Sequence, residues 1–331
     1  MRIALDAMGT DQAPASEVAG ALLALRELDD DLEVILVGDQ AAIEAELSRH
    51  VDVPSARLHV QHAPDRVRPG EPPAAVVRRR PESSIVVGLR LQKQGEADAF
   101  VSAGSTGAVM AASLFILRPL KGVDRPAIGT LLPTARDPVL MLDAGANVDC
   151  KPQHLLQFAQ LGHIYAQDLM GVAAPRIALL NIGEEPGKGD ELAVEAHQLL
   201  STSGLHFIGN VEGRDIIGGA CDVLVCDGFV GNVLLKFYES VAEFIIGMLQ
   251  RELSHTQETL DLHEVFRVLD YSEYGGAPLL GVGGVSIICH GESTPKAVRN
   301  AIRGAAQAVR SSMIVHIAKE LSGAARTAEE A

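Results

Sequence analysis

The sequence has no surplus of basic residues and no tryptophan. Its 331 residues include 43 acidic and 28 basic side chains, which gives a formal net charge of −15. Proteins that bind DNA or RNA usually carry a basic surface, so this charge argues against a nucleic-acid partner. The overall field also repels anions, so an anion site must depend on local donors and local cations.

Long apolar runs and paired cysteines are missing as well. The longest apolar stretch, around residues 108–117, is far shorter than the ~20 residues that span a membrane. The first residues are typical of a strand, without a signal-peptide pattern, so we expect a cytoplasmic protein. The four cysteines are scattered, with no C-x-x-C pair and no histidine cluster nearby. This argues against a disulfide framework and a zinc site, and we expect no metal.

The sequence is rich in short runs of Val, Ile and Leu that alternate with segments of helical period. Two such predicted helices cover residues 15–28 and 154–169. The predicted strands are residues 2–6, 33–37, 57–61, 97–101, 127–132, 139–142, 176–181, 206–209, 222–226 and 285–289. This alternation predicts an α/β fold with a doubly wound, mostly parallel sheet.

The same alternation predicts one α/β domain over residues 1–321. We expect a small, charged tail without fixed structure at 322–331. Residues 65–82, rich in proline and arginine, are predicted to form a long surface loop. Two amphipathic helices in succession predict a helical hairpin inserted at about residues 233–270.

Polar, glycine-rich loops follow many of the predicted strands. In an open parallel sheet, ligands bind beyond the carboxyl ends of the strands. Small residues let backbone N–H groups close around an anion, and hydroxyl groups add donors. The candidate ligands are Asp6, Gly9, Ser102, Gly104, Ser105, Thr106, Asn147, Asn181, Gly183, Lys188, Asn210, Glu212, Asp227, Asn232 and Lys236. Such loops predict a site for a phosphate-type anion, although ordinary turns and helix caps explain any one of them alone.

Several enzyme classes are disfavoured by missing motifs. The loop after residue 180 resembles a P-loop, but only three residues separate Gly183 from Gly187, and Gly189 stands where Ser or Thr would bind magnesium. No G-x-S-x-G motif is present, and no G-x-G-x-x-G motif follows the first strand, which argues against a serine hydrolase and a Rossmann dinucleotide site. Direct transfer between two bound substrates is favoured over a covalent intermediate.

A series of motifs from Arg2 to about Ile302 resembles the bacterial phosphate acyltransferase family (PlsX). The motifs are Asp6-Ala-Met-Gly9, Ser102-Ala-Gly104, Asp143-Ala-Gly145-Ala-Asn147, Asn181-Ile-Gly183-Glu184, Gly209-Asn210-Val-Glu212-Gly213-Arg214-Asp215, Cys226-Asp227-Gly228-Phe229-Val-Gly231-Asn232 and Tyr274-Gly275-Gly276-Ala277-Pro278-Leu-Leu-Gly281. The resemblance implies an enzyme of phospholipid synthesis that moves a fatty acyl group from acyl carrier protein onto inorganic phosphate. It also implies a phosphotransacetylase/isocitrate-dehydrogenase-like fold, a homodimer, peripheral membrane contact, and no cofactor.

This reaction needs groups that hold a phosphate dianion and stabilise an oxyanion. We expect Lys188, Asn232, Lys236 and the 102–106 turn to do so, with Asp227 and Asp6 orienting donors or accepting a proton. The sequence departs from the family pattern at four positions, which bear on activity and substrate preference. Thr10 stands where a second glycine is usual, Gln12 where histidine is common, and Ser105 and Gly283 where asparagine is usual.

The two macromolecular contacts that the resemblance implies need local features. Carrier protein and this chain are both acidic, so docking needs a basic patch, for which Arg78, Arg79 and Arg80 are the densest candidates; a solvated loop is the alternative. The tip of the hairpin is acidic, so contact with the inner face of the cell membrane would be weak and depend on apolar side chains. The expected contacts are Leu260, Leu262, Val265 and Phe266.

Two other functions compete with this one. An NAD(P)- and metal-dependent β-decarboxylating dehydrogenase of similar fold would need a set of metal-binding carboxylates and an arginine-rich substrate pocket, and neither is apparent in the sequence. A non-catalytic scaffold that binds carrier protein or lipid is the second alternative, for which Thr10, Gln12 and Ser105 are the only indications.

Overall fold

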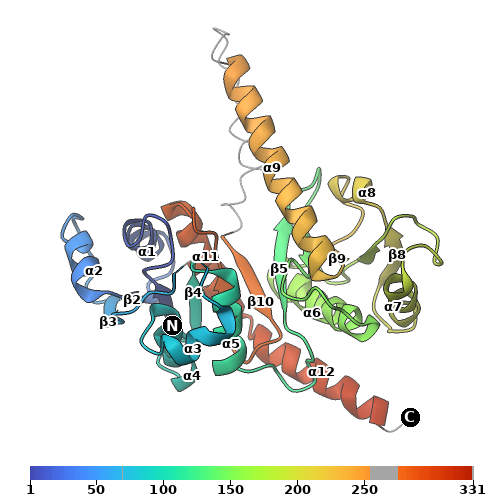
Figure 1. Ribbon diagram of the computed structural model, residues 1–331, viewed down its shortest axis with the longest axis horizontal. Helices are drawn as coiled ribbons and strands as arrows, with labels where there is room; N and C mark the ends of the chain where they lie inside the picture. The colour runs from blue at the N-terminus through green and yellow to red at the C-terminus, as the bar shows by residue number, and fades with distance from the viewer. Residues whose placement is uncertain (69, 254–274, 330–331) are drawn as a thin grey trace. The chain divides into compact units, whose positions relative to one another are not determined.

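The computed structural model describes residues 1–68, 70–253 and 275–329 (Figure 1). Their contacts divide the chain into two compact units. Unit 1 comprises Met1–Pro126 with Tyr274–Ala331, and unit 2 comprises Ala127–Glu273. The sequence contains no sign of this division, because strands and helices alternate in the same way in both units.

The sheet of unit 1 has the strand order β3-β2-β1-β4-β11-β10. These strands are β1 (Arg2–Asp6), β2 (Glu33–Gly38), β3 (Leu58–His62), β4 (Ala99–Ser102), β10 (Ala277–Leu280) and β11 (Val285–Ile288). All neighbours in this order are parallel except β10 and β11, which are antiparallel. Strand β10 is not among the predicted strands, because Pro278 lacks a backbone N–H and argues against a strand.

Helices cover both faces of this sheet. They are α1 (Ala15–Glu27), α2 (Gln40–Leu47), α3 (Val76–Arg79), α4 (Ser84–Gln94), α5 (Thr106–Ile116), α11 (Pro295–Arg310) and α12 (Met313–Glu329), with a short 3-10 helix η1 (Pro73–Ala75). Figure 1 shows α1 and α11 on one side and α4 and α5 on the other. Helices α1 and α11 meet where a Cβ on Gly20 would lie 2.5 Å from the Cβ of Val298.

Two segments of unit 1 are more helical than the sequence predicts. The loop predicted at 65–82 contains η1 and α3. Helix α12 continues to Glu329, through most of the segment predicted to be a tail. Alanine is the strongest helix former, and this segment includes Ala324, Ala325 and Ala328.

Unit 2 has the strand order β5-β6-β9-β7-β8. Its strands are β5 (Ala127–Leu132), β6 (Val139–Leu142), β7 (Ile177–Leu180), β8 (Phe207–Val211) and β9 (Val223–Val225), and its helices are α6 (Pro152–Met170), α7 (Glu191–Ser201), α8 (Gly213–Ile217) and α9 (Gly228–Leu253). Strands β5 and β6 are antiparallel, and the other neighbours are parallel. The predicted α/β fold with a mostly parallel sheet is confirmed.

Helix α9 is the part of the predicted hairpin that the structure describes, and it begins at Gly228. The apolar side chains of Phe237, Phe244 and Met248 are exposed along it. The second predicted helix, with the expected membrane contacts Leu260, Leu262, Val265 and Phe266, lies outside the described residues. Among the described helices, none has the length and apolar character needed to cross a membrane.

Candidate functional site

The loops that follow β1 and β4 lie against each other in unit 1. A Cβ on Gly9 would lie 2.7 Å from the backbone nitrogen of Gly104 and 2.8 Å from that of Ala103. Real Cβ atoms do not approach backbone this closely, so only glycine at position 9 allows the two loops to meet. Their contact is what brings the predicted residues Asp6, Gly9, Ser102 and Gly104 together.

Asp6 is buried at the centre of this contact. The Ser102 hydroxyl donates to Oδ2 of Asp6 at 2.6 Å, the Met8 N–H donates to Oδ1 at 3.0 Å, and the Gly104 N–H donates to the Ser102 hydroxyl at 3.0 Å. Burial raises the pKa of Asp6, and the hydrogen bonds from Ser102 and Met8 oppose that rise. Asp6 and Ser102 therefore fix the shape of the two loops.

A cavity of about 350 Å³ opens above these loops, and we call it the polar pocket. Gly9, Gly104, Ser105 and Thr106 line it. Ser105 and Thr106 are exposed at the N-terminus of α5, and the Ser105 side chain does not cap the helix. The first N–H groups of a helix lack intrahelical partners and attract anions. Backbone donors and two hydroxyl groups are thus available in one place.

Arg66 also lines the polar pocket and supplies a permanent positive charge. Its Nη2 donates to the backbone oxygen of Thr10 at 2.9 Å. A guanidinium carries five N–H donors, so others remain for a ligand. Arg66 was not among the predicted ligands, because it lies 56 residues from Thr10 in the sequence and no local motif marks it.

In unit 2, the Asp143 carboxyl group organises the loop after β6. Its Oδ1 accepts from the N–H groups of Ile128 and Ala146 at 2.9 and 3.1 Å, and its Oδ2 accepts from the backbone N–H and side-chain Nδ2 of Asn147 at 2.7 and 3.0 Å. Burial raises the pKa of Asp143, and these hydrogen bonds oppose the rise. Asn147 was predicted to bind substrate, but its amide is used to hold Asp143.

The predicted catalytic residues near the start of α9 have other partners. Oδ1 of Asp227 accepts from the N–H groups of Phe229 and Val230 at 2.8 and 3.0 Å, so Asp227 caps the helix and does not orient Asn232 or Lys236. The Nζ of Lys236 lies 2.7 Å from Oε2 of Glu239 in an exposed ion pair. Asn232 is exposed, and its Cβ lies near Gly145. The sequence placed Asn232 and Lys236 on one face but could not show these competing partners.

The amide groups of Asn181 and of Asn210 in β8, both predicted as ligands, hold the loop between β7 and α7. Asn181 accepts from the Ile182 N–H at 2.8 Å and donates from Nδ2 to the Lys188 oxygen at 2.9 Å. Asn210 donates from Nδ2 to the Glu185 oxygen at 2.9 Å, and its Oδ1 lies 2.9 Å from Nδ1 of His197.

Gly183 is buried in the same loop, while the Lys188 side chain is exposed. Lys188 therefore stays available for a ligand.

Glu212 was also predicted to bind phosphate or substrate. The structure places it at the N-cap of α8. Its backbone N–H donates to Oδ2 of Asp215 at 2.9 Å, and its carboxylate lies 3.3 Å from Nη2 of Arg214. The Glu212 carboxylate is thus paired with Arg214, and its role as a ligand stays a prediction.

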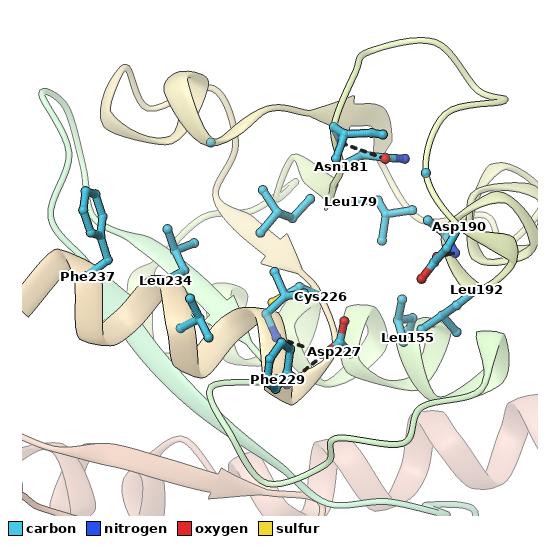
Figure 2. A pocket seen from close by; sticks show the side chains of 17 residues that line it. Leu155, Leu179, Asn181, Asp190, Leu192, Cys226, Asp227, Phe229, Leu234 and Phe237 are labelled. Atoms are coloured by element: carbon cyan, nitrogen blue, oxygen red, sulfur yellow. Dashed lines mark hydrogen bonds between the residues drawn. The ribbon is translucent and has the colours of Figure 1, made fainter.

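A second, larger cavity of about 620 Å³ lies in unit 2 beside the ends of β7 and β9, and we call it the apolar pocket (Figure 2). Its lining is mainly aliphatic and aromatic, and it includes Leu155, Leu179, Phe229, Leu234 and Phe237. The side chains of the lining that carry oxygen atoms are Asn181, Asp190 and Asp227. Lysine and arginine are absent from its described lining.

In the predicted carrier-docking patch, Arg78–Arg80, one of the three arginines is already paired with carboxylates. Arg80 lies 3.2 Å from a carboxylate oxygen of Glu71 and 3.7 Å from one of Asp65. Arg78 and Arg79 are exposed on α3. Arg80 therefore belongs to an internal ion-pair network, and Arg78 and Arg79 carry the available charge.

The strand orders and the loops at the strand ends define an α/β fold with a mostly parallel sheet, similar to that of phosphotransacetylases. The EutD phosphotransacetylase from Staphylococcus aureus aligns with a TM-score of 0.62 over 93% of this chain and 94% of that chain, at 16% identity, which shows the shared fold. Residues 1–316 match a family model described as "Fatty acid synthesis protein".

Two curated relatives are named "Phosphate acyltransferase". The one from Desulforamulus reducens is 49% identical over 328 residues and 97% of each chain, and the one from Heliobacterium modesticaldum is 51% identical over 331 residues and 98% of each chain. The chain belongs to the phosphate acyltransferase family, as the motifs predicted.

Proposed function

We propose that the enzyme transfers a fatty acyl group from the thioester of acyl carrier protein onto inorganic phosphate, and that phosphate binds in the polar pocket. Membership of the family supports the reaction. The observation that carries the phosphate site is the meeting of Arg66 with the N-terminus of α5, where Ser105 and Thr106 are exposed. A dianion is held best by a cation and several N–H or O–H donors together.

The chemistry forms one bond and breaks another. A phosphate oxygen attacks the carbonyl carbon of the thioester, a C–O bond forms, and the carbonyl oxygen becomes an oxyanion. When the carbonyl re-forms, the C–S bond breaks, and the departing thiolate of the carrier takes up the proton that the attacking hydrogen phosphate loses. Positioning and neutralisation of charge accelerate such a step. Lys188, exposed in the loop after β7, is a cation of unit 2 that we propose for contact with the acyl substrate.

The partners and assembly are part of the same proposal. We propose that Arg78 and Arg79 attract acidic carrier protein, because both are exposed and neighbouring Arg80 is paired. The exposed apolar residues Phe244 and Met248 on α9 support weak membrane contact or a homodimer. Vesicle flotation and sedimentation would test these two forms of association.

The phosphate site is tested by a matched pair of arginine variants. Arg66→Ala removes the cation of the polar pocket, whereas Arg68→Ala removes an exposed arginine that does not line it. A hydrogen bond to a charged group contributes about 1.5–3 kcal/mol, so the KM for phosphate should rise about 10- to 100-fold in Arg66→Ala only. Acyl phosphate formation from acyl carrier protein would be measured without added metal or nucleotide. Equal KM values for phosphate in both variants would show that phosphate does not bind in the polar pocket.

A further inference from the structure

We propose that the apolar pocket of unit 2 binds the acyl chain of the substrate. This inference rests on the proposed function, because it assigns a place to one part of that substrate. The pocket lies beside the carboxyl ends of β7 and β9, which is where ligands bind in open α/β sheets. No other segment of the described chain fills its volume of about 620 Å³.

The walls of the pocket have the chemistry of a hydrocarbon ligand. Leu155 from α6, Leu179 from β7 and Leu234 from α9 face the same space in Figure 2. Phe229 and Phe237, also from α9, extend this surface, and they are 63% and 65% exposed. Exposed aromatic side chains that line a cavity are stabilised when an apolar ligand covers them. Ligand pockets of about 300–1,000 Å³ are typical of small molecules, so the pocket has room for a long chain.

The charges of the apolar pocket disfavour phosphate, the other substrate of the proposed reaction. Asp190 and Asp227 are its charged side chains, and no lysine or arginine is among its described lining residues. Two carboxylates without a cation repel phosphate. A hydrocarbon can cover the apolar wall while Asp190 stays exposed and Asp227 keeps its hydrogen bonds to α9. The polar pocket of unit 1 also contains two carboxylates, Asp6 and Asp11, but it adds the cation Arg66 and exposed hydroxyl groups. The two pockets thus differ in polarity in the same way as phosphate and an acyl chain.

Binding can be observed directly because the protein has no tryptophan. Phe229→Trp would place a single tryptophan in the pocket, and Val51→Trp would place one at a 77% exposed position of unit 1, outside the pocket lining. We expect palmitoyl-pantetheine to shift the emission of Phe229→Trp to shorter wavelength, while butyryl-pantetheine at the same concentration has little effect. Val51→Trp should respond to neither.

An activity measurement makes the same test without a fluorophore. Val233→Asp places a charge on the pocket wall at a side chain that is 55% exposed, and Val315→Asp makes the same change at a 65% exposed position on α12. Val233→Asp should lower kcat/KM for the palmitoyl substrate at least tenfold and for the butyryl substrate less than twofold. Val315→Asp should change neither.

Three outcomes overturn the proposal. Equal emission shifts at both tryptophans would mean non-specific adsorption. A shift in Phe229→Trp that follows protein concentration without ligand would mean that a second copy covers the pocket. Equal losses for both chain lengths in Val233→Asp would mean that the pocket does not hold the chain. If the wild-type protein forms no acyl phosphate, the proposed function fails, but the emission test still decides whether the pocket binds an acyl chain.

Discussion

Thr10 donates both its backbone N–H and its hydroxyl to the carboxyl group of Glu17, at 2.6 and 2.9 Å. Both residues are buried, and the carbonyl of the same threonine accepts from Arg66. Glu17 therefore holds the loop that carries Gly9 through its two hydrogen bonds with Thr10. The Thr10 carbonyl links the same loop to Arg66, the cation of the polar pocket. A glycine at position 10, which is usual in the family, would have no hydroxyl for Glu17.

Because Glu17 is buried beside Thr10, we expect the stability of the protein to depend on pH. Burial raises the pKa of Glu17 from 4.5 to about 7, and the hydrogen bonds from Thr10 oppose the rise. Between these two values the folded protein holds a proton that the unfolded chain has lost, so the free energy of unfolding falls as pH rises from about 4.5 to 7. The shift corresponds to about 3 kcal/mol from this group.

The comparison with Glu17→Gln, which does not titrate, isolates that contribution. Urea unfolding of both proteins would be measured from pH 4.5 to 8. The wild-type protein should lose stability relative to the variant across this range and become parallel to it above pH 7.5. Parallel curves throughout would show that Glu17 titrates normally and that its burial has no such effect.

A second prediction concerns Thr10 itself. Thr10→Val keeps the shape of the side chain but removes the hydroxyl, which leaves the buried Glu17 carboxyl group with one donor fewer. The expected cost is about 1–3 kcal/mol of stability. The KM for phosphate should also rise, because the Thr10 carbonyl that holds Arg66 is no longer fixed.

Thr10→Ser is the control, since it restores a hydroxyl and should recover most of the stability and the KM. An unchanged KM for phosphate in Thr10→Val would show that the hydrogen bonds between Thr10 and Glu17 do not affect the phosphate site.

Two glycines of α9 give a matched pair for packing. A Cβ on Gly231 would overlap the carbonyl oxygen of Asp143, whereas a Cβ on Gly247 would meet nothing within 4 Å. Gly231→Ala should destabilise unit 2 by at least about 1–3 kcal/mol through overpacking. Gly247→Ala should be neutral or stabilising by up to about 1 kcal/mol, because alanine is the better helix former. Thermal unfolding would measure both, and equal effects would contradict the contact between α9 and the Asp143 loop.

The strands were predictable where apolar runs are short and bounded by polar residues. Residues 127–132 and 139–142 are observed as β5 and β6 with the predicted bounds. Periodicity does not show strand direction, so the antiparallel pairing of β5 with β6 could not be predicted. The division into two units was hidden for a related reason, since the chain leaves unit 1 after Pro126 and returns to it later.

The sequence predicted which loops form the site, but not which hydrogen-bond and ion-pair partners their side chains have. The motifs identified Gly9 and Gly104, whose contact builds the polar pocket. They could not show that Asp227 caps α9 or that Lys236 pairs with Glu239, because those choices depend on side-chain geometry. Arg66 was missed for the opposite reason, since only the fold brings it to Thr10.

We expect acidic carrier protein to dock on the exposed charges of α3. Arg78 and Arg79 are exposed, while Arg80 is paired with Glu71, so reversing the first two charges removes attraction without breaking an ion pair. The double variant Arg78→Glu/Arg79→Glu should lower kcat/KM for acyl carrier protein about tenfold or more at low salt, because charges at the rim of an interface mainly change the association rate. The loss should shrink as salt screens the charges.

The small neutral substrate palmitoyl-pantetheine provides the necessary comparison, because it needs no protein docking and should react at an unchanged rate. Lys93→Glu, which reverses an exposed charge at the end of α4, controls for net charge and should affect neither substrate. Steady-state rates with both substrates at two salt concentrations would decide the matter. Equal losses with the carrier-bound and the small substrate would mean that the arginines act on the reaction itself, and the docking role of α3 would be lost.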